Sequence, residues 1–200
     1  MDALSVLVLA TQCGSGAPAP ILTALAIAQT DGAPFAIIVD NELKIQPTIE
    51  AAVQAAASGL IHDSVVRVGI AGLPTTEFDK RNLSYPSGFS ACRNLSVAGL
   101  VLRKRWTQLG AKEADWRLAA IEIAQGKTDH VSDFAKKFDA AFLQVAEAEH
   151  ELSRLSAAVP REQSSPALGD TMPHLKTSQS DSGEPHATPQ DSDSVMVFKN

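Results

Sequence analysis

The feature that most constrains this sequence is a seven-residue repeat of apolar side chains within positions 129–159. Sustained over about four heptads, such a stripe predicts one long amphipathic helix. At a rise of ~1.5 Å per residue the helix would be about 45 Å long, which is long for a small core. The first apolar position of the repeat is occupied by Val131, Phe138, Val145, Leu152 and Val159. The second is occupied by Phe134, Ala141, Ala148 and Leu155.

Two arrangements would bury this stripe. The helix can pack against the preceding part of its own chain in a three-helix bundle, or against a partner helix or a second copy of the chain. The small side chains of Ala141 and Ala148 would let two helices approach closely. The sequence therefore predicts a homo-oligomer or a partner helix. The expected contact residues are Val131, Phe134, Phe138, Ala141, Val145, Ala148, Leu152 and Leu155.

Two further helices are expected before this one. Residues 89–109 form an apolar and then basic segment that stops at Gly110, and residues 113–125 form a segment that stops at Gly126. Thr128 or Asp129 would cap the long helix. The region 89–159 is thus predicted to be helical, and the Pro-, Ser- and Gly-containing residues 73–88 are predicted to form a loop.

The N-terminal part, 1–72, has the pattern of alternating strands and helices. That order favours a small β-α-β-type unit with a parallel or mixed sheet, and so an α-rich α/β fold class. The Ala-rich runs keep helix as an alternative for several segments. The expected strands are 4–9, 35–39 and 65–70, and the expected helices are 21–29 and 47–57.

The last segment, 160–200, differs in composition from the rest of the chain. It contains five of the eleven prolines and seven serines, and its net charge is −3. Such a segment buries too little apolar surface to offset the entropy lost on ordering, so a disordered acidic tail is predicted.

Positive charge is concentrated in the middle of the chain. The whole sequence has a net charge of −6, yet residues 67–126 contain nine basic and five acidic residues. Three consecutive cations, Arg103, Lys104 and Arg105, precede Trp106 at the end of a helical segment. Clustered cations beside an aromatic ring are typical of nucleic-acid or other polyanion sites. The candidate binding residues are Arg93, Arg103, Lys104, Arg105, Trp106, Lys112 and Arg117.

Two alternatives to nucleic-acid binding remain for these cations. Cations in the last turn of a helix are favoured by the helix dipole alone, and an acidic protein patch would also be attracted to them. In addition, residues 103–110, followed by Asp115 and the helical run 118–124, are similar to a helical segment of flexuous plant-virus coat proteins. That resemblance implies an RNA-coating role as an alternative function.

A nucleotide-binding protein or an enzyme that uses the loop 10–20 is a further alternative. Gly14, Ser15 and Gly16 stand where a phosphate-binding loop would lie, but Pro18 and Pro20 remove backbone donors. The sequence contains no Gly-x-Ser-x-Gly elbow and no Cys/His cluster. We therefore expect a non-enzymatic interaction or assembly protein, although enzymatic activity stays open. No cofactor, metal site or catalytic residue is predicted.

Cysteine content and hydropathy bear on the compartment. Cys13 and Cys92 stand far apart and are predicted to be reduced, buried thiols. Met1-Asp2 lacks the positive start of a signal peptide. The uncharged residues 3–30 are interrupted by Gly and Pro before they reach the ~20 apolar residues that a bilayer core requires. The sequence thus predicts a cytoplasmic protein that does not contact a membrane.

Overall fold

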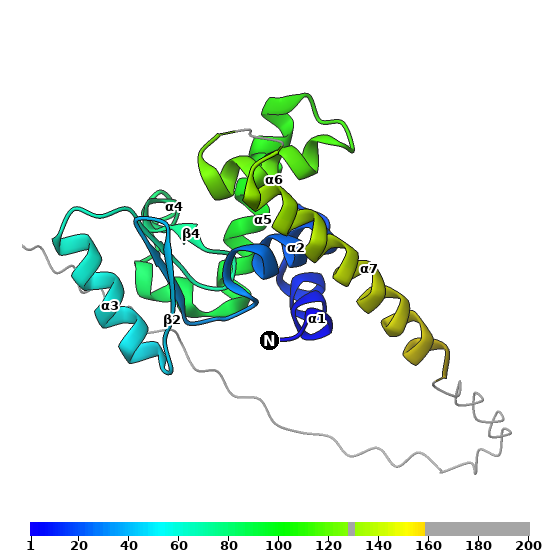
Figure 1. The fold of residues 1–200 in the computed structure, drawn as a ribbon, viewed down its shortest axis with the longest axis horizontal. Helices are drawn as coiled ribbons and strands as arrows, with labels where there is room; N and C mark the ends of the chain where they lie inside the picture. The colour runs from blue at the N-terminus through cyan, green and yellow to red at the C-terminus, as the bar shows by residue number, and fades with distance from the viewer. Residues whose placement is uncertain (128–130, 159–200) are drawn as a thin grey trace, which may run out of the picture. The chain divides into compact units, whose positions relative to one another are not determined.

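The computed structural model describes residues 1–127 and 131–158. They form an α-rich fold with a small four-stranded sheet in the N-terminal part and helices in the C-terminal part, which confirms the predicted fold class. Figure 1 shows the helix α3 on one side of the sheet and α1, α2 and α7 beyond the other side. The predicted disordered tail, 160–200, and the expected caps Thr128 and Asp129 lie outside the described residues.

Residues 4–9 are not a strand, so the prediction for this segment is wrong. They belong to the helix α1 (Ala3–Cys13), whose N-terminus is capped by Asp2. The Asp2 carboxylate accepts a hydrogen bond of 2.8 Å from the backbone N–H of Ser5. The run 4–9 is apolar at nearly every position, so it has no clear period that distinguishes a strand from a helix. The buried side chains of α1 are Val6, Leu7 and Ala10.

The predicted helix at 21–29 is confirmed and lies at the centre of the fold. It is α2 (Ala19–Thr30), with Pro20 in its first turn. The helix ends at Asp31, whose φ of +54° is left-handed. Buried residues lie on every side of α2, because it contacts α1, α5, α6 and α7.

The sheet is antiparallel throughout the described residues, so the predicted parallel or mixed arrangement is wrong. Its strand order is β2-β1-β3-β4. Ile37 of β1 pairs with Lys44 of β2 on one side and with Val68 of β3 on the other. The strands are β1 (Ala36–Val39), β2 (Glu42–Ile45), β3 (Val66–Val68) and β4 (Leu73–Pro74).

A tight hairpin between β1 and β2 explains why the sheet is antiparallel and not parallel or mixed. Asp40 and Asn41 both have positive φ, +50° and +72°, as two-residue hairpin turns require. They reverse the chain directly into β2, whose four residues are all exposed. An exposed edge strand has no apolar run, so hydrophobic periodicity did not indicate it. The chain then returns through α3 to place β3 antiparallel to β1.

The helix predicted at 47–57 is confirmed and extends further, as α3 (Ile49–Ile61). Thr48 caps it by accepting a hydrogen bond of 3.2 Å from the N–H of Ala51. Its small buried residues face the sheet: a Cβ added to Gly59 would lie 2.7 Å from a methyl carbon of Val66. The predicted loop 73–88 is only partly irregular, because it contains β4, the short helix α4 (Thr75–Asp79) and all but the last residue of the 3-10 helix η1 (Tyr85–Phe89).

The three predicted C-terminal helices are confirmed. They are α5 (Ala91–Leu109), α6 (Asp115–Gln125) and α7 (Asp133–Ala158). α5 and α6 end at Gly110 and Gly126, both with positive φ. α7 packs mainly against α2, and also contacts α1 and α6. Figure 1 shows α7 running past these helices.

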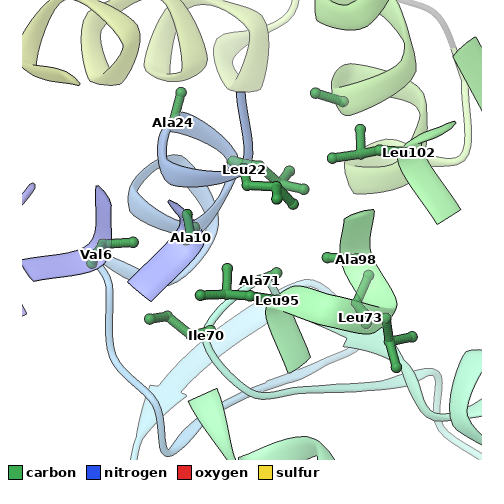
Figure 2. Close-up of a cluster of buried hydrophobic side chains, with 14 of the residues drawn as sticks. Val6, Ala10, Leu22, Ala24, Ile70, Ala71, Leu73, Leu95, Ala98 and Leu102 are labelled. Atoms are coloured by element: carbon green, nitrogen blue, oxygen red, sulfur yellow. The ribbon is translucent and has the colours of Figure 1, made fainter. Parts of the chain in front are cut away.

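The core joins the helices to the sheet. Figure 2 shows side chains from α1, α2 and α5 converging with Ile70, Ala71 and Leu73. Asn94 of α5 fastens this junction: its Oδ1 accepts from the N–H of Ala71 at 2.8 Å, and its Nδ2 donates to the carbonyls of Val68 and Gly88, both at 2.9 Å. The side chain is fully buried, and these bonds satisfy backbone groups that water does not reach.

A disulfide joins Cys13 to Cys92, so the prediction of two reduced thiols is wrong. The two residues are 79 positions apart, and their Cα atoms are 5.1 Å apart. Cys13 is the last residue of α1, and Cys92 lies in the first turn of α5. The pairing arises because α1 packs on α5, which brings these two helix ends together.

Candidate basic groove

Two basic pairs that are distant in the sequence meet around one groove. Lys80 and Arg81 follow α4, while Lys104 and Arg105 lie near the end of α5. All four line a cavity of about 480 Å³, together with Glu77 of α4 and Glu122 of α6. We call this feature the basic groove.

The groove has more positive than negative charge. Glu77 pairs with two cations: its carboxylate lies 2.6 Å from Lys80 Nζ and 2.9 Å from Arg81 Nη1. Glu122 pairs with Arg105, and Lys104 makes no ion pair within 1–127 and 131–158. Four cations against two carboxylates leave a net charge of +2 in the groove.

The surroundings of Glu77 keep it ionised. Partial burial alone would raise the pKa of this carboxyl. Hydrogen bonds from Lys80 and Arg81, and the charges of both, outweigh burial and lower the pKa. Glu77 therefore holds both cations at the groove while cancelling only one of their charges.

The pair of Arg105 and Glu122 leaves polar atoms unused. Arg105 Nη1 donates to Gln108 Oε1 at 2.8 Å, and Nη2 donates to Glu122. The Nε–H of Arg105 and the Oε2 of Glu122 are buried and have no hydrogen-bond partner in the part of the chain that the structure describes. Buried polar groups are usually satisfied, so these two atoms are exceptions within the described residues.

Trp106 lies outside the groove residues and is already stacked. Its ring lies on that of Trp116, with centroids 4.5 Å apart and an angle of 3° between the planes. Its Nε1 donates to the carbonyl of Lys112 at 2.7 Å. Trp116 thus covers one face of the indole, and this face cannot stack on a nucleic-acid base.

The remaining predicted binding residues are dispersed. Arg117 donates to both carboxylate oxygens of Asp139 on α7, at 2.6 and 2.7 Å. The stem of Arg103 packs at Gly16, where an added Cβ would lie 2.9 Å from Arg103 Cδ. Arg93 and Lys112 are exposed, and neither lines the groove. Of the seven residues predicted from sequence, the groove contains Lys104 and Arg105.

Sequence patterns did not indicate Lys80 and Arg81. Two adjacent cations in a loop have no pattern of their own. The only signal was their contribution to the basic middle segment of the chain. Their position beside Lys104 and Arg105 depends on the packing of α4 against α5.

The loop proposed for nucleotide binding packs against α5. Ser15 Oγ lies 3.2 Å from Ser96 Oγ, and a Cβ on Gly99 would lie 2.3 Å from the carbonyl oxygen of Ser15. The loop also follows a helix rather than a strand. It connects α1 to α2 against small residues of α5, an arrangement that does not resemble a phosphate-binding loop.

Most of the predicted self-association stripe lies inside the chain. Phe138, Ala141, Val145 and Ala148 are buried. Phe134 and Leu152 are half-buried. Val131 and Leu155, at the ends of the stripe, are 80% and 54% exposed. In this structure the apolar stripe of α7 therefore packs within its own chain, largely against α2.

The described residues contain neither a metal-binding cluster nor a helix that could span a membrane. Within 1–127 and 131–158, no three His, Cys, Asp or Glu side chains are grouped closely enough to hold a metal ion. Over the same residues, no helix has both the length and the apolar character needed to cross a membrane.

Comparisons with known proteins do not place this chain in a family. No family model, curated protein or solved structure matches it. The function of the chain is therefore inferred from its own residues.

Proposed function

We propose that this protein binds nucleic acid through the basic groove, by contacts to the phosphate backbone. The observation that supports the proposal is the meeting of Lys80, Arg81, Lys104 and Arg105 around one cavity with a net charge of +2. The chain as a whole has a net charge of −6, so the positive net charge of the groove is opposite in sign to that of the whole chain. Clustered Lys and Arg side chains supply the salt-dependent part of nucleic-acid affinity.

The arrangement favours phosphate contacts over base reading. Arg81 and Arg105 offer planar groups with several N–H donors, which suit phosphate oxygens. Trp106 is stacked on Trp116, so base stacking is not part of the proposal. Contacts of this kind position a nucleic acid without selecting its sequence.

Fluorescence anisotropy of labelled single-stranded and duplex oligonucleotides, measured from about 50 to 200 mM salt, tests this proposal. The test variant changes Lys80 and Lys104 to Gln, which removes two exposed cations and keeps Arg81 and Arg105 in their ion pairs. Its affinity should fall, and the slope of log K against log salt should decrease by about 1.4 to 1.8.

The matched control changes Lys136 and Lys137 to Gln, which removes the same charge from the exposed surface of α7. This control should keep the wild-type slope. Equal losses in the two variants would show that net charge alone is responsible. Wild-type protein without any salt-dependent binding would overturn the proposal, and tighter binding to an acidic peptide than to either oligonucleotide would replace nucleic acid with a protein partner.

Self-association remains a prediction, and the disulfide bears on the predicted location in the cytoplasm. The exposed apolar side chain of Leu143 on α7, 69% exposed, offers a surface for assembly that does not belong to the stripe. The disulfide between Cys13 and Cys92 is typical of an oxidising compartment and argues against the cytoplasm.

A further inference from the structure

A second cavity, lined by none of the basic-groove residues, lies between α2, the β1–β2 hairpin, the end of α6 and α7. Its volume is about 640 Å³, within the range of small-molecule sites. Part of its wall is apolar, and the larger apolar side chains are Ile27, Ile38, Leu43 and Phe134. Another part is polar and contains the side chains of Arg67 and Gln29.

Arg67 is the unusual member of this wall, because it is a buried cation without a carboxylate partner. Its exposed fraction is 8%, and it makes no ion pair among the described residues. Its Nε donates to the carbonyl of Gly72 at 2.7 Å. Its two Nη atoms donate to the carbonyls of Ala124 and Ile123, at 2.5 and 2.6 Å, in the last turn of α6.

These hydrogen bonds use most of the donors of Arg67. When the Gln29 amide is oriented to satisfy both of its ends, its oxygen also accepts from Arg67 Nη2, at 3.1 Å. Four of the five N–H groups of the guanidinium are then occupied, and one on Nη1 is left. The guanidinium N–H groups link β3 to α6 by hydrogen bonds, and a neutral side chain with N–H donors could also form such bonds.

The charge of Arg67 is only partly compensated. The C-terminus of a helix has a partial charge of about −0.5, which offsets roughly half of one cation. Burial lowers the pKa of the Arg67 guanidinium to about 10, so it stays protonated at neutral pH. A buried charge without an opposite charge is costly, and a bound anion would remove much of that cost.

Four more charged groups line the cavity, but at exposed positions. They are Asp31, Lys127, Asp133 and Lys137. Asp133 is paired with Lys136, 3.1 Å away. Exposed charges are screened by water and salt, whereas the charge of Arg67 is screened much less. Arg67 therefore decides which sign of charge the inner wall attracts.

We infer that this cavity binds a small amphipathic carboxylate, with its carboxylate toward Arg67 and its apolar part against Ile27, Ile38, Leu43 and Phe134. A medium-chain fatty acid has this chemistry: one anionic head and one flexible apolar body. The inference is independent of the basic groove, whose residues do not line this cavity.

Titration calorimetry with octanoate tests the inference, with octan-1-ol and octylamine as neutral and cationic probes of the same chain length. Octanoate should bind with a Kd below about 1 mM, and at least tenfold more tightly than either of the two probes. Octanoate that binds more weakly than this, or no better than octan-1-ol or octylamine, would overturn the inference.

Substitutions at the cavity wall and outside it test whether octanoate binds in this cavity. Leu43→Glu introduces a carboxylate on the exposed strand β2 at the cavity wall and should weaken octanoate binding at least tenfold. Ile45→Glu makes the same change on the same strand outside the cavity and should bind as the wild type does. Arg67→Gln keeps donors but removes the charge, so it should lose the preference for octanoate over octan-1-ol. If Arg67→Gln does not fold, the Leu43 and Ile45 pair decides, and equal binding by these two variants would overturn the inference.

Measuring oligonucleotide and octanoate binding by the same variants tests whether the groove and the cavity act independently. Leu43→Glu should leave the oligonucleotide affinity of the protein unchanged, and the Lys80 and Lys104 variant should bind octanoate normally. If Leu43→Glu abolished both activities, a change in the fold would explain the loss, and the assignment of octanoate to this cavity would fail.

Discussion

The indole of Trp106 lies parallel to that of Trp116, with ring centroids 4.5 Å apart. The contact joins the end of α5 to the first turn of α6 across the turn at Gly110. Trp116 is the buried member, with an exposed fraction of 7%. The ring that the sequence suggested for a ligand thus serves a contact between two helices.

Replacing Trp116 with Ala should therefore destabilise the protein. A buried Trp→Ala change costs about 3–5 kcal/mol of unfolding free energy, through lost burial and the cavity left behind. Urea denaturation measures this loss. Trp106 should then emit at longer wavelength, because water reaches the face that Trp116 covered. Unchanged stability together with unchanged emission would contradict the stacked arrangement.

Loss of the disulfide between Cys13 and Cys92 should also lower stability. A disulfide that closes a long loop contributes about 2–4 kcal/mol, mainly by restricting the unfolded chain. The variant with both cysteines changed to Ser should therefore unfold at lower urea concentration than the oxidised wild type. Reductant should destabilise the wild type and leave the variant unaffected. Purified protein that reacts with a thiol reagent at both cysteines before reduction would show that the bond does not form.

Two substitutions on α7 distinguish internal packing from assembly. Val145 is fully buried, so Val145→Asp places a charge in the core and should unfold the protein. Leu143, 69% exposed, is the matched site, and Leu143→Asp should leave the melting temperature nearly unchanged.

Light scattering on the same two variants reports the mass of the particle. If the wild type is an oligomer and Val145→Asp is a folded monomer, the stripe is an interface between chains. A fall in mass caused by Leu143→Asp alone would instead place an interface on the outer face of α7.

Asn94→Ala should be among the more damaging substitutions in the sheet region. It removes the partners of the Ala71 N–H and of the carbonyls of Val68 and Gly88. Each buried group left unsatisfied costs about 1–3 kcal/mol. Ser96→Ala, on the same helix and bonded through its hydroxyl to Ser15, is the control and should cost much less. Thermal unfolding compares the two, and equal losses would contradict the role assigned to Asn94.

The pair of Arg117 and Asp139 makes stability depend on pH at the acid end. The hydrogen bond from Arg117 lowers the pKa of Asp139 in the folded protein. The resulting stabilisation is present above the unfolded pKa of Asp and is lost as the pH falls through the lower folded pKa. Asp139→Asn should therefore be less stable than the wild type at neutral pH, by about 1 kcal/mol or less because the pair is exposed. This difference should vanish in acid, and a constant difference across the pH range would contradict the prediction.

Local signals in the sequence predicted the helices well. The stops at Gly110 and Gly126 and the start of α3 at Thr48 depend on backbone geometry that neighbouring residues determine. The same reasoning failed for residues 4–9, where apolar residues occupy nearly every position and give no period. It also missed β2, whose exposed residues do not alternate with a buried face.

The sequence by itself thus determined the helices α2, α3, α5, α6 and α7 and the concentration of cations in the middle of the chain, because both follow from residues close together along the backbone. Tertiary structure alone decided the direction of β3 against β1, the bond between Cys13 and Cys92, and the burial of the α7 stripe against α2. It also placed Lys80 and Arg81 beside Lys104 and Arg105. The physical reason is that contacts between distant segments depend on how whole elements bury their apolar faces together, and many pairings of those faces satisfy the same sequence pattern.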